Sequence, residues 1–195
     1  MMAILLKYGN TNTYLVCGVG GSLLIDTDYA GTLPGFYRAI KAAGVRLGDI
    51  GYVLATHYHP DHMGLIGELM QQGVKLLLLE HQRGQVHFSD AIFARDKHLR
   101  YTPIAEAQAT VISCAESRAF LAGLGIAGEL IATRSHSADG VALLLDGGEC
   151  FVGDVEPPAF VAGYADNAAL AQDWQLLRGG GAKVAHYAHR GDTEV

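Results

Sequence analysis

The chain has 195 residues, 50% hydrophobic and 17% charged, which is typical of a soluble globular protein built as one domain or two closely fused half-domains. We treat residues 1–195 as a single domain. A net charge of −6 without a run of lysine or arginine argues against nucleic-acid binding, and no apolar stretch reaches membrane-spanning length.

The N-terminus lacks the basic segment and the cleavage site of a signal peptide, and three widely spaced cysteines form no C-x-x-C. These features lead us to expect a cytoplasmic protein. Along the first third of the chain, short apolar runs at 3–7, 13–17 and 22–25 are separated by glycine turns and predict a β-meander. A helix is expected at 33–43, and a buried strand at 52–56.

The rest of the chain alternates apolar runs of helical and strand length. Helices are predicted at 63–70, within 90–95 behind Ser89, at 114–124 and at 168–177. Strands are predicted at 74–79, 110–113, 129–133, 141–145, 150–152 and 183–188. Sheets covered by helices follow from this order.

The densest chemistry lies in Thr56-His57-Tyr58-His59-Pro60-Asp61-His62, directly after the strand expected at 52–56. If the strand continues through His59, the side chains of His57 and His59 point to one side, about 6–7 Å apart along the backbone, and can share a metal ion. Pro60 should end the extended segment, so that Asp61 and His62 fall on a turn and reach a second ion. A solvent-exposed loop would not need this pattern.

Further metal-capable side chains follow other expected strands, at positions that could meet the first motif. Together the candidate metal ligands are His57, His59, Asp61, His62, His136, Asp154 and His189. Seven ligands suffice for two ions. Asp26 and Asp154 also end similar hairpin arms, which suggests two halves whose strand ends meet at a common edge.

These residues resemble the metallo-β-lactamase fold superfamily of metallohydrolases. The resemblance rests on the His57 to His62 motif, on Ser-His136-Ser, on Gly153-Asp154 and on the final Ala188-His189, and it spans nearly the whole chain. It implies an α/β (α+β) fold, a four-layer αβ/βα sandwich, with a dinuclear zinc site at the edge shared by the two sheets. Iron or manganese are the alternative metals.

The resemblance also implies how the ligands are divided. His57, His59 and His136 would hold one ion, Asp61, His62 and His189 the other, and Asp154 would bridge them. Asp26 would support the site from behind the ligands.

Two departures from the family pattern alter the walls of the pocket without removing a ligand. The usual Pro-Gly before the second histidine region is Arg134-Ser135, and the usual Pro-Gly before the last histidine is Tyr187-Ala188. His186 competes with His189 as the last ligand, but alternation along a strand would put the two on opposite faces. We prefer His189 because it closes the strand.

The predicted activity is hydrolysis of a small ester, thioester, lactone or phosphoester by a hydroxide that bridges two metal ions about 3.5–4 Å apart. Asp61 and Asp154 are assigned catalytic roles in addition to metal binding, and Asp61 would orient the nucleophile. The alternatives are a mononuclear iron enzyme similar to sulfur dioxygenases and a non-catalytic metal-binding member of the fold. The histidine at position 59 argues against the oxygen-reducing diiron type, which carries glutamate there.

The expected partner is a small-molecule substrate, with neither nucleic acid nor membrane, and the sequence leaves open whether the protein forms a homo-oligomer. Substrate specificity is expected to come from residues 80–101 and 157–167. His87 is the histidine of the first segment most suited to face substrate, whereas Tyr58 and Cys150 are expected to be buried and His81 and His98 to be surface or hydrogen-bonded residues.

Overall fold

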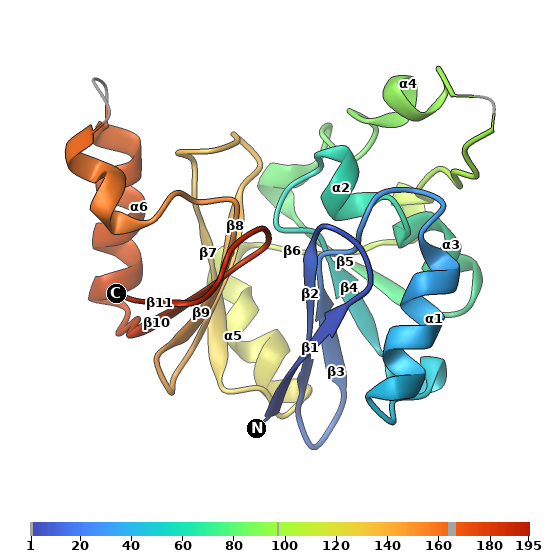
Figure 1. The fold of residues 1–195 in the computed structure, drawn as a ribbon. Coiled ribbons are helices and arrows are strands. Elements are labelled where there is room, and N and C mark those ends of the chain that lie inside the picture. Colours follow the sequence, from blue (N-terminus) through green and yellow to red (C-terminus); the bar gives the residue numbers. More distant parts are fainter. Residues whose placement is uncertain (1, 97, 164–166) are drawn as a thin grey trace.

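The computed structural model describes residues 2–96, 98–163 and 167–195. Within these residues the strands form two mixed sheets that face each other, with helices on the two outer faces (Figure 1). The order of the layers is helix, sheet, sheet, helix, as expected from the sequence.

The first sheet has the strand order β1-β2-β3-β4-β5-β6. Its strands are β1 (Met2–Lys7), β2 (Asn12–Cys17), β3 (Ser22–Ile25), β4 (Tyr52–Leu54), β5 (Lys75–Leu79) and β6 (Thr110–Ile112). The first three pair antiparallel, as the predicted meander requires, and β3 to β6 pair parallel. Parallel pairing places the ends of β3 and β4 at the same edge.

The second sheet has the order β11-β10-β9-β8-β7. Its strands are β7 (Gly128–Ala132), β8 (Val141–Leu145), β9 (Glu149–Gly153), β10 (Val184–Tyr187) and β11 (Thr193–Glu194). The predicted hairpin is β8 with β9, and β10 lies parallel to β9, so both end at one edge. The sequence analysis did not predict β11.

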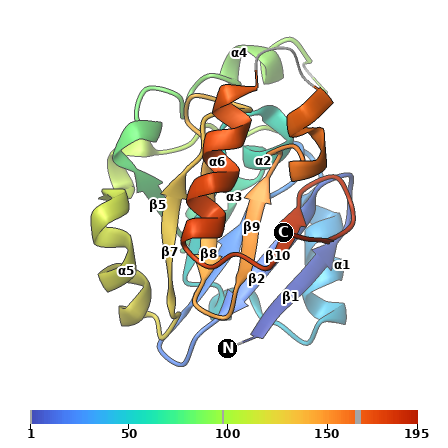
Figure 2. The same cartoon turned by 90° about the vertical axis from the view of Figure 1, so that its left-hand side faces the viewer.

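Helices lie on the outer faces of both sheets, and one, at residues 114–123, packs against the cluster between the sheets. They are α1 (Leu33–Ala42), α2 (Pro60–Met63), α3 (Ile66–Gln71), α4 (Asp90–Phe93), α5 (Cys114–Gly123) and α6 (Ala168–Gly179), with 3-10 turns η1 (Leu47–Asp49), η2 (Glu80–Gln82), η3 (Glu106–Gln108) and η4 (Pro158–Gly163). Figure 1 shows α1 and α3 outside the first sheet, and Figure 2 shows α6 across the outer face of the second. None of the helices in the described part of the chain has the length and apolar character needed to cross a membrane.

Three apolar clusters hold these layers together. One lies between the first sheet and helices α1 to α3, one between the two sheets, and one between the second sheet and α6. Leu23 and Leu77 from the first sheet meet Leu143 and Phe151 from the second in the middle cluster, and all four side chains are buried. Burial of apolar surface on both faces of each sheet fixes the layer order.

Several element boundaries differ from the sequence prediction around the first motif. The strand predicted to reach Thr56 ends at Leu54, because the Thr56 amide donates to the Asp26 carboxylate (2.6 Å) instead of to a neighbouring strand. Asp61 and His62 lie in the short helix α2 rather than on a turn. The helix predicted at 63–70 is divided into α2 and α3.

The helix expected behind Ser89 is also shorter than predicted and ends at Phe93. Ser89 precedes it, but its hydroxyl donates to the Tyr58 carbonyl oxygen (2.7 Å) rather than capping the helix. Position 97 of the segment 80–101 and positions 164–166 of the segment 157–167 lie outside the described residues.

Candidate metal centre

The candidate ligands gather at one edge of the molecule, on loops that leave four different strands. The loop after β4 carries His57 and His59, the loop after β7 carries His136, β9 leads directly into Asp154, and His189 follows β10. Because β3 and β4 run parallel, as do β9 and β10, the polar residues that follow them meet at a common edge.

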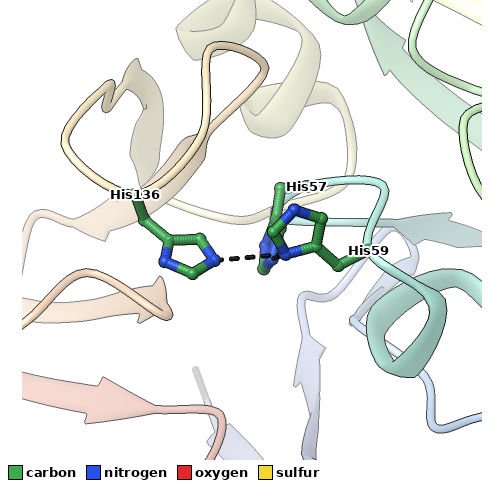
Figure 3. A group of neighbouring side chains, drawn as sticks. All are labelled: His57, His59 and His136. Atoms are coloured by element: carbon green, nitrogen blue, oxygen red, sulfur yellow. Dashed lines mark hydrogen bonds between the residues drawn. The ribbon is translucent and has the colours of Figure 1, made fainter.

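Three histidines form the first ligand group (Figure 3). His57 Nε2 lies 3.0 Å from His59 Nδ1, and His136 Nε2 lies 3.3 Å from the same His59 nitrogen. His57 and His59 are held by one loop, and His136 reaches them from the opposite sheet. His57 is buried, whereas about a third of the His136 side chain is exposed. The group therefore opens to solvent on the His136 side.

Asp61, His62 and His189 form the second ligand group. His189 Nε2 lies 3.2 Å from Asp61 Oδ2 and 3.3 Å from His62 Nε2. His62 is fully buried, and Asp61 is 40% exposed. Pro60 begins α2, so that consecutive residues of one helical turn can present Asp61 and His62 to the same point.

The carboxylate of Asp154 lies between the two groups. Its Oδ2 is 3.6 Å from His136 Nε2 and 3.3 Å from His62 Nε2, and its Oδ1 is 3.5 Å from His189 Nε2. One side chain is thus within reach of both groups, as the predicted bridging role requires.

A buried aspartate on the first sheet supports the ligands from behind. Asp26 Oδ2 accepts a hydrogen bond from His62 Nδ1 (3.0 Å) and another from Thr56 Oγ1 (2.9 Å). Thr56 Oγ1 in turn lies 3.2 Å from His57 Nδ1. These contacts direct the Nε2 atoms of both histidines toward the cluster, which is how outer carboxylates orient imidazole ligands. Asp26 adopts a φ of +58°, a strained conformation characteristic of functional sites.

Gly153 is required where β9 meets the ligand cluster. Its φ is +60°, and a Cβ built there would lie 2.4 Å from Thr56 Oγ1. Only glycine combines this left-handed backbone with so close an approach. Asp154 can consequently follow the end of β9 directly into the cluster.

The electrostatics separate the cluster into neutral and charged members. Burial lowers the pKa values of His57 and His136, so both imidazoles are neutral and offer lone pairs at neutral pH. Burial also opposes a charge on His62, but the carboxylates of Asp26 and Asp154 outweigh it and raise the pKa of His62 to about 10. The carboxylates thus favour positive charge between them.

The carboxylates of the cluster remain ionised at neutral pH. The hydrogen bond from His189 lowers the pKa of Asp61 to about 2. For Asp154, burial would raise the pKa, but the hydrogen bond and charge of His62 lower it to about 2. Two anionic carboxylates and five imidazoles match the ligand preferences of a divalent borderline ion such as zinc.

The spacing of the ligand atoms also fits a metal. Nitrogen ligands about 2.0–2.1 Å from a tetrahedral zinc ion stand about 3.3 Å apart. The separations of His59 Nδ1 from His57 Nε2 (3.0 Å) and from His136 Nε2 (3.3 Å) match the edges of such a tetrahedron, as does the 3.3 Å between His62 and His189. The described residues therefore fit one ion in each group.

Among the cavities that border the ligands, two have volumes of about 300 Å³ or more. One of about 300 Å³ is lined by Ser135, His136, Asp154, Glu156, Asn167, Ala169 and Leu170. Another of about 400 Å³ adjoins His189 on the side of β1 and β2 and includes Lys7 and Asn12. The exposed ring of Phe88 lies near the first group, with its centroid 6.0 Å from that of His59.

The remaining histidines have other surroundings. His186 stacks on Phe151, with ring centroids 4.7 Å apart, and its Nδ1 lies 3.0 Å from Asp192. His189 is therefore the one of the two that lies at the ligand cluster. The Nδ1 atom of His87, the histidine of the segment 80–101 most suited to face substrate, lies 2.9 Å from Asp90 Oδ2.

Other expectations concern packing. Tyr58 and Cys150 are buried among apolar side chains, as predicted. His81 Nε2 lies 3.2 Å from the carbonyl oxygen of Gly140. His98 lines a different cavity, formed by residues 30–34, 68 and 98–100.

Two residues that organise the site, Asp139 and Asp173, were missed in the sequence, and Thr56 was named there only as the start of the motif, without a role. Asp139 accepts a hydrogen bond from the Tyr58 amide (2.8 Å), and Asp173 accepts from the amides of Arg134 and Ser135. Thr56 is the polar residue directly before His57, and this position was the available signal for its role. Asp139 and Asp173 carry no comparable signal, because their partners are backbone amides far away in the sequence.

The model of a family described as the Metallo-beta-lactamase superfamily matches residues 6–189. The Metallo-beta-lactamase domain-containing protein 1 of Rattus norvegicus is 36% identical over 73 residues, which are 37% of this chain and 28% of the rat protein. In three such curated relatives the matched region spans between 15% and 28% of the relative's length.

Solved structures with similar folds cover almost all of the chain. The metallo-beta-lactamase family protein TTHA1429 from Thermus thermophilus has a TM-score of 0.69 and 19% identity, over 98% of this chain and 73% of that one. TTHA1623, solved in a di-iron-bound form, has a TM-score of 0.71 and 20% identity, over 100% of this chain and 94% of that one. At these identities the likeness concerns the fold alone.

Proposed function

The chain belongs to the metallo-beta-lactamase superfamily, and we propose that it is a hydrolase with two metal ions, zinc in the first place, that cleaves a small ester, thioester, lactone or phosphoester. Members of this superfamily are usually metal-dependent hydrolases. The partner of the protein is then a small-molecule substrate.

The observation that carries the proposal is the position of Asp154 between two complete ligand groups. His57, His59 and His136 would hold one ion, and Asp61, His62 and His189 the other. Asp154, within 4.0 Å of a histidine nitrogen in each group, would contact both. A purely structural zinc site is closed by four ligands of its own, whereas each ion here would have three ligands of its own and share Asp154, and the first group is open to solvent at His136.

When two ions are bound, they supply a water molecule of lowered pKa and polarise the oxygen of the bond to be cleaved. The side chains supply the rest. Asp61 and Asp154 stay ionised at neutral pH, with pKa values of about 2, and can accept a hydrogen bond that orients the attacking water. Asp61 is the more exposed of the two, at 40% against 19%, so its carboxylate is the one closer to solvent.

Access to the centre favours a small substrate. The cavity of about 300 Å³ reaches His136 and Asp154 and lies at the lower end of the range for ligand pockets. Glu156 and Ser135 give this cavity a polar wall, while Ala169 and Leu170 give it an apolar one. A substrate with one polar and one apolar portion would match both walls.

Iron is the alternative metal, because the similar structure of TTHA1623 was solved in a di-iron-bound form. An iron-containing enzyme similar to sulfur dioxygenases would then be the second candidate function. Metal analysis of protein purified from its own host separates the two candidates, since the iron enzyme would be coloured and would carry iron rather than zinc.

The proposed function is tested with the double variant His59→Ala/Asp154→Ala and a control double variant, Arg118→Ala/Asp146→Ala, which removes an exposed ion pair outside the ligand groups. Wild type and control should bind two zinc ions per chain and hydrolyse at least one member of an ester, thioester, lactone and phosphoester panel. The double variant should lose both properties. Two ions retained in the double variant would refute the assigned ligands, and a metal-loaded wild type inactive on the whole panel would favour a non-catalytic role.

A further inference from the structure

Backbone hydrogen bonds close the base of the loop that carries His136. The Thr133 amide donates to the Gly140 carbonyl oxygen (2.9 Å), and the Gly140 amide donates to the Ser137 carbonyl oxygen (3.1 Å). His136 lies at the far end of this loop and reaches across to the other sheet (Figure 3). Its position therefore depends on what holds the loop.

A buried aspartate of helix α6 holds the first half of the loop. Asp173 is 3% exposed, and its two carboxylate oxygens accept hydrogen bonds from the Arg134 amide at 3.0 Å each, while Oδ2 also accepts from the Ser135 amide at 2.8 Å. Bonds from amides to an ionised acceptor are stronger than neutral ones. The two residues immediately before His136 are thus fixed to the outer helix shown in Figure 2.

A second buried aspartate holds the other half of the loop. The Asp139 carboxylate accepts from the Tyr58 amide (2.8 Å) and from the Ser137 hydroxyl. Tyr58 lies between His57 and His59, so this contact joins the loop of the third histidine to the loop of the first two. The Asp139 carbonyl oxygen also accepts from Gln82 Nε2 (3.1 Å).

His136 needs this support more than His57, His62 and His189 do. His57, His62 and His189 each have a partner close to the ring nitrogen that faces away from the cluster, namely Thr56, Asp26 and the Asn10 carbonyl oxygen. For the part of the chain that the structure describes, no such partner is present at His136 Nδ1. The direction of the His136 ring is then set by its backbone rather than by a hydrogen bond to the ring.

We propose that Asp173 is a positioning residue for the three-histidine group and that it sets the affinity of that group for its metal ion, with Asp139 acting on the other side of the loop. This inference rests on the proposed two-ion centre. It assigns to α6 a role beyond packing, because the Asp173 carboxylate of this outer helix holds the loop that carries His136 at the edge of the second sheet. Outer carboxylates commonly change metal affinity by about 10–100-fold.

The test is the variant Asp173→Asn, which keeps the shape of the side chain but replaces one accepting oxygen by an NH₂ group that faces an amide donor. Metal-free wild type and variant are titrated with Co²⁺ against a competing chelator, and the visible absorption of bound Co²⁺ is recorded at each step. His136→Ala and His189→Ala identify which step and which bands belong to each group. Asp146→Asn, at an exposed aspartate paired with Arg118, is the control.

Asp173→Asn should weaken Co²⁺ binding at the three-histidine group about 10–100-fold and shift its absorption bands, while the affinity of the other group changes less than about threefold. Asp139→Asn should weaken the same step, and it is the deciding variant if Asp173→Asn does not fold. Asp146→Asn should resemble wild type. Unchanged affinity and bands in the folded variants, or equal loss at both steps, would overturn the inference. A wild type that binds no Co²⁺ would instead refute the proposed metal centre.

Discussion

Replacement of Gly153 by alanine is expected to destabilise the protein and to disturb the metal centre at once. Gly153 immediately precedes Asp154 and has a φ of +60°. A Cβ at this position would lie 2.4 Å from Thr56 Oγ1 and 2.8 Å from Thr56 Cβ. Thr56 cannot move aside freely, because its amide and its hydroxyl both donate to Asp26, at 2.6 and 2.9 Å.

Two costs add in this variant. A left-handed backbone costs an L-residue about 1–2 kcal/mol, and one extra methyl group in a packed site costs about 1–3 kcal/mol. The expected loss in the free energy of unfolding is therefore about 2–5 kcal/mol. Displacement of Thr56 should also disturb His57, whose Nδ1 lies 3.2 Å from the threonine hydroxyl.

Two further glycines separate these costs. Gly73 has a φ of +94° with nothing within 4 Å of the position that an added methyl group would take, so Gly73→Ala isolates the backbone cost of about 1–2 kcal/mol. Gly147 has neither a left-handed φ nor a close neighbour, and Gly147→Ala should change stability by less than about 1 kcal/mol. Urea unfolding of the metal-free proteins gives each value, provided that the m-value is constant. A Gly153→Ala variant no less stable than Gly73→Ala would refute the contact with Thr56.

Three further predictions concern the site and its surroundings. Burial raises the pKa of Cys150 to about 12, so this thiol should stay protonated at pH 8. It should resist a disulfide reagent until the protein unfolds in denaturant. Rapid reaction of all three thiols in the native protein would contradict the burial of Cys150. Asp26→Asn keeps a side chain that tolerates the left-handed backbone but removes the charge beside His62. Competition with a chelator should show that the variant binds the ion at His62 about 10–100-fold more weakly than wild type. Equal affinity in the two proteins would exclude the supporting role of Asp26. His189→Gln should lower zinc content from two ions to one by elemental analysis, whereas His186→Gln should retain both, and the reverse result would exchange their roles.

Much of the centre was predictable because four of its ligands lie within six residues of the sequence, from His57 to His62. The spacing of His57, His59, Asp61 and His62 limits where their side chains can point, whatever the rest of the fold. The division of the predicted helix was not predictable. The His62 carbonyl oxygen accepts from the amide and hydroxyl of Thr27, and the Leu65 amide donates to Thr27 Oγ1 (3.2 Å), so contacts with another segment replace bonds that would have continued the helix.

The sequence by itself determined that helices cover sheets, through the order of its apolar runs, the four-layer fold class, through the resemblance of its motifs to a known family, and the two half-sites of the first motif. Only the tertiary structure decided how His136, Asp154 and His189 meet them, because parallel pairing of β9 with β10 and packing of the two sheets bring together residues 77 to 127 positions apart. The supports at Asp139 and Asp173 belong to the tertiary structure alone. A buried carboxylate that binds backbone amides can serve any sequence, so its partners appear only when the chain is folded.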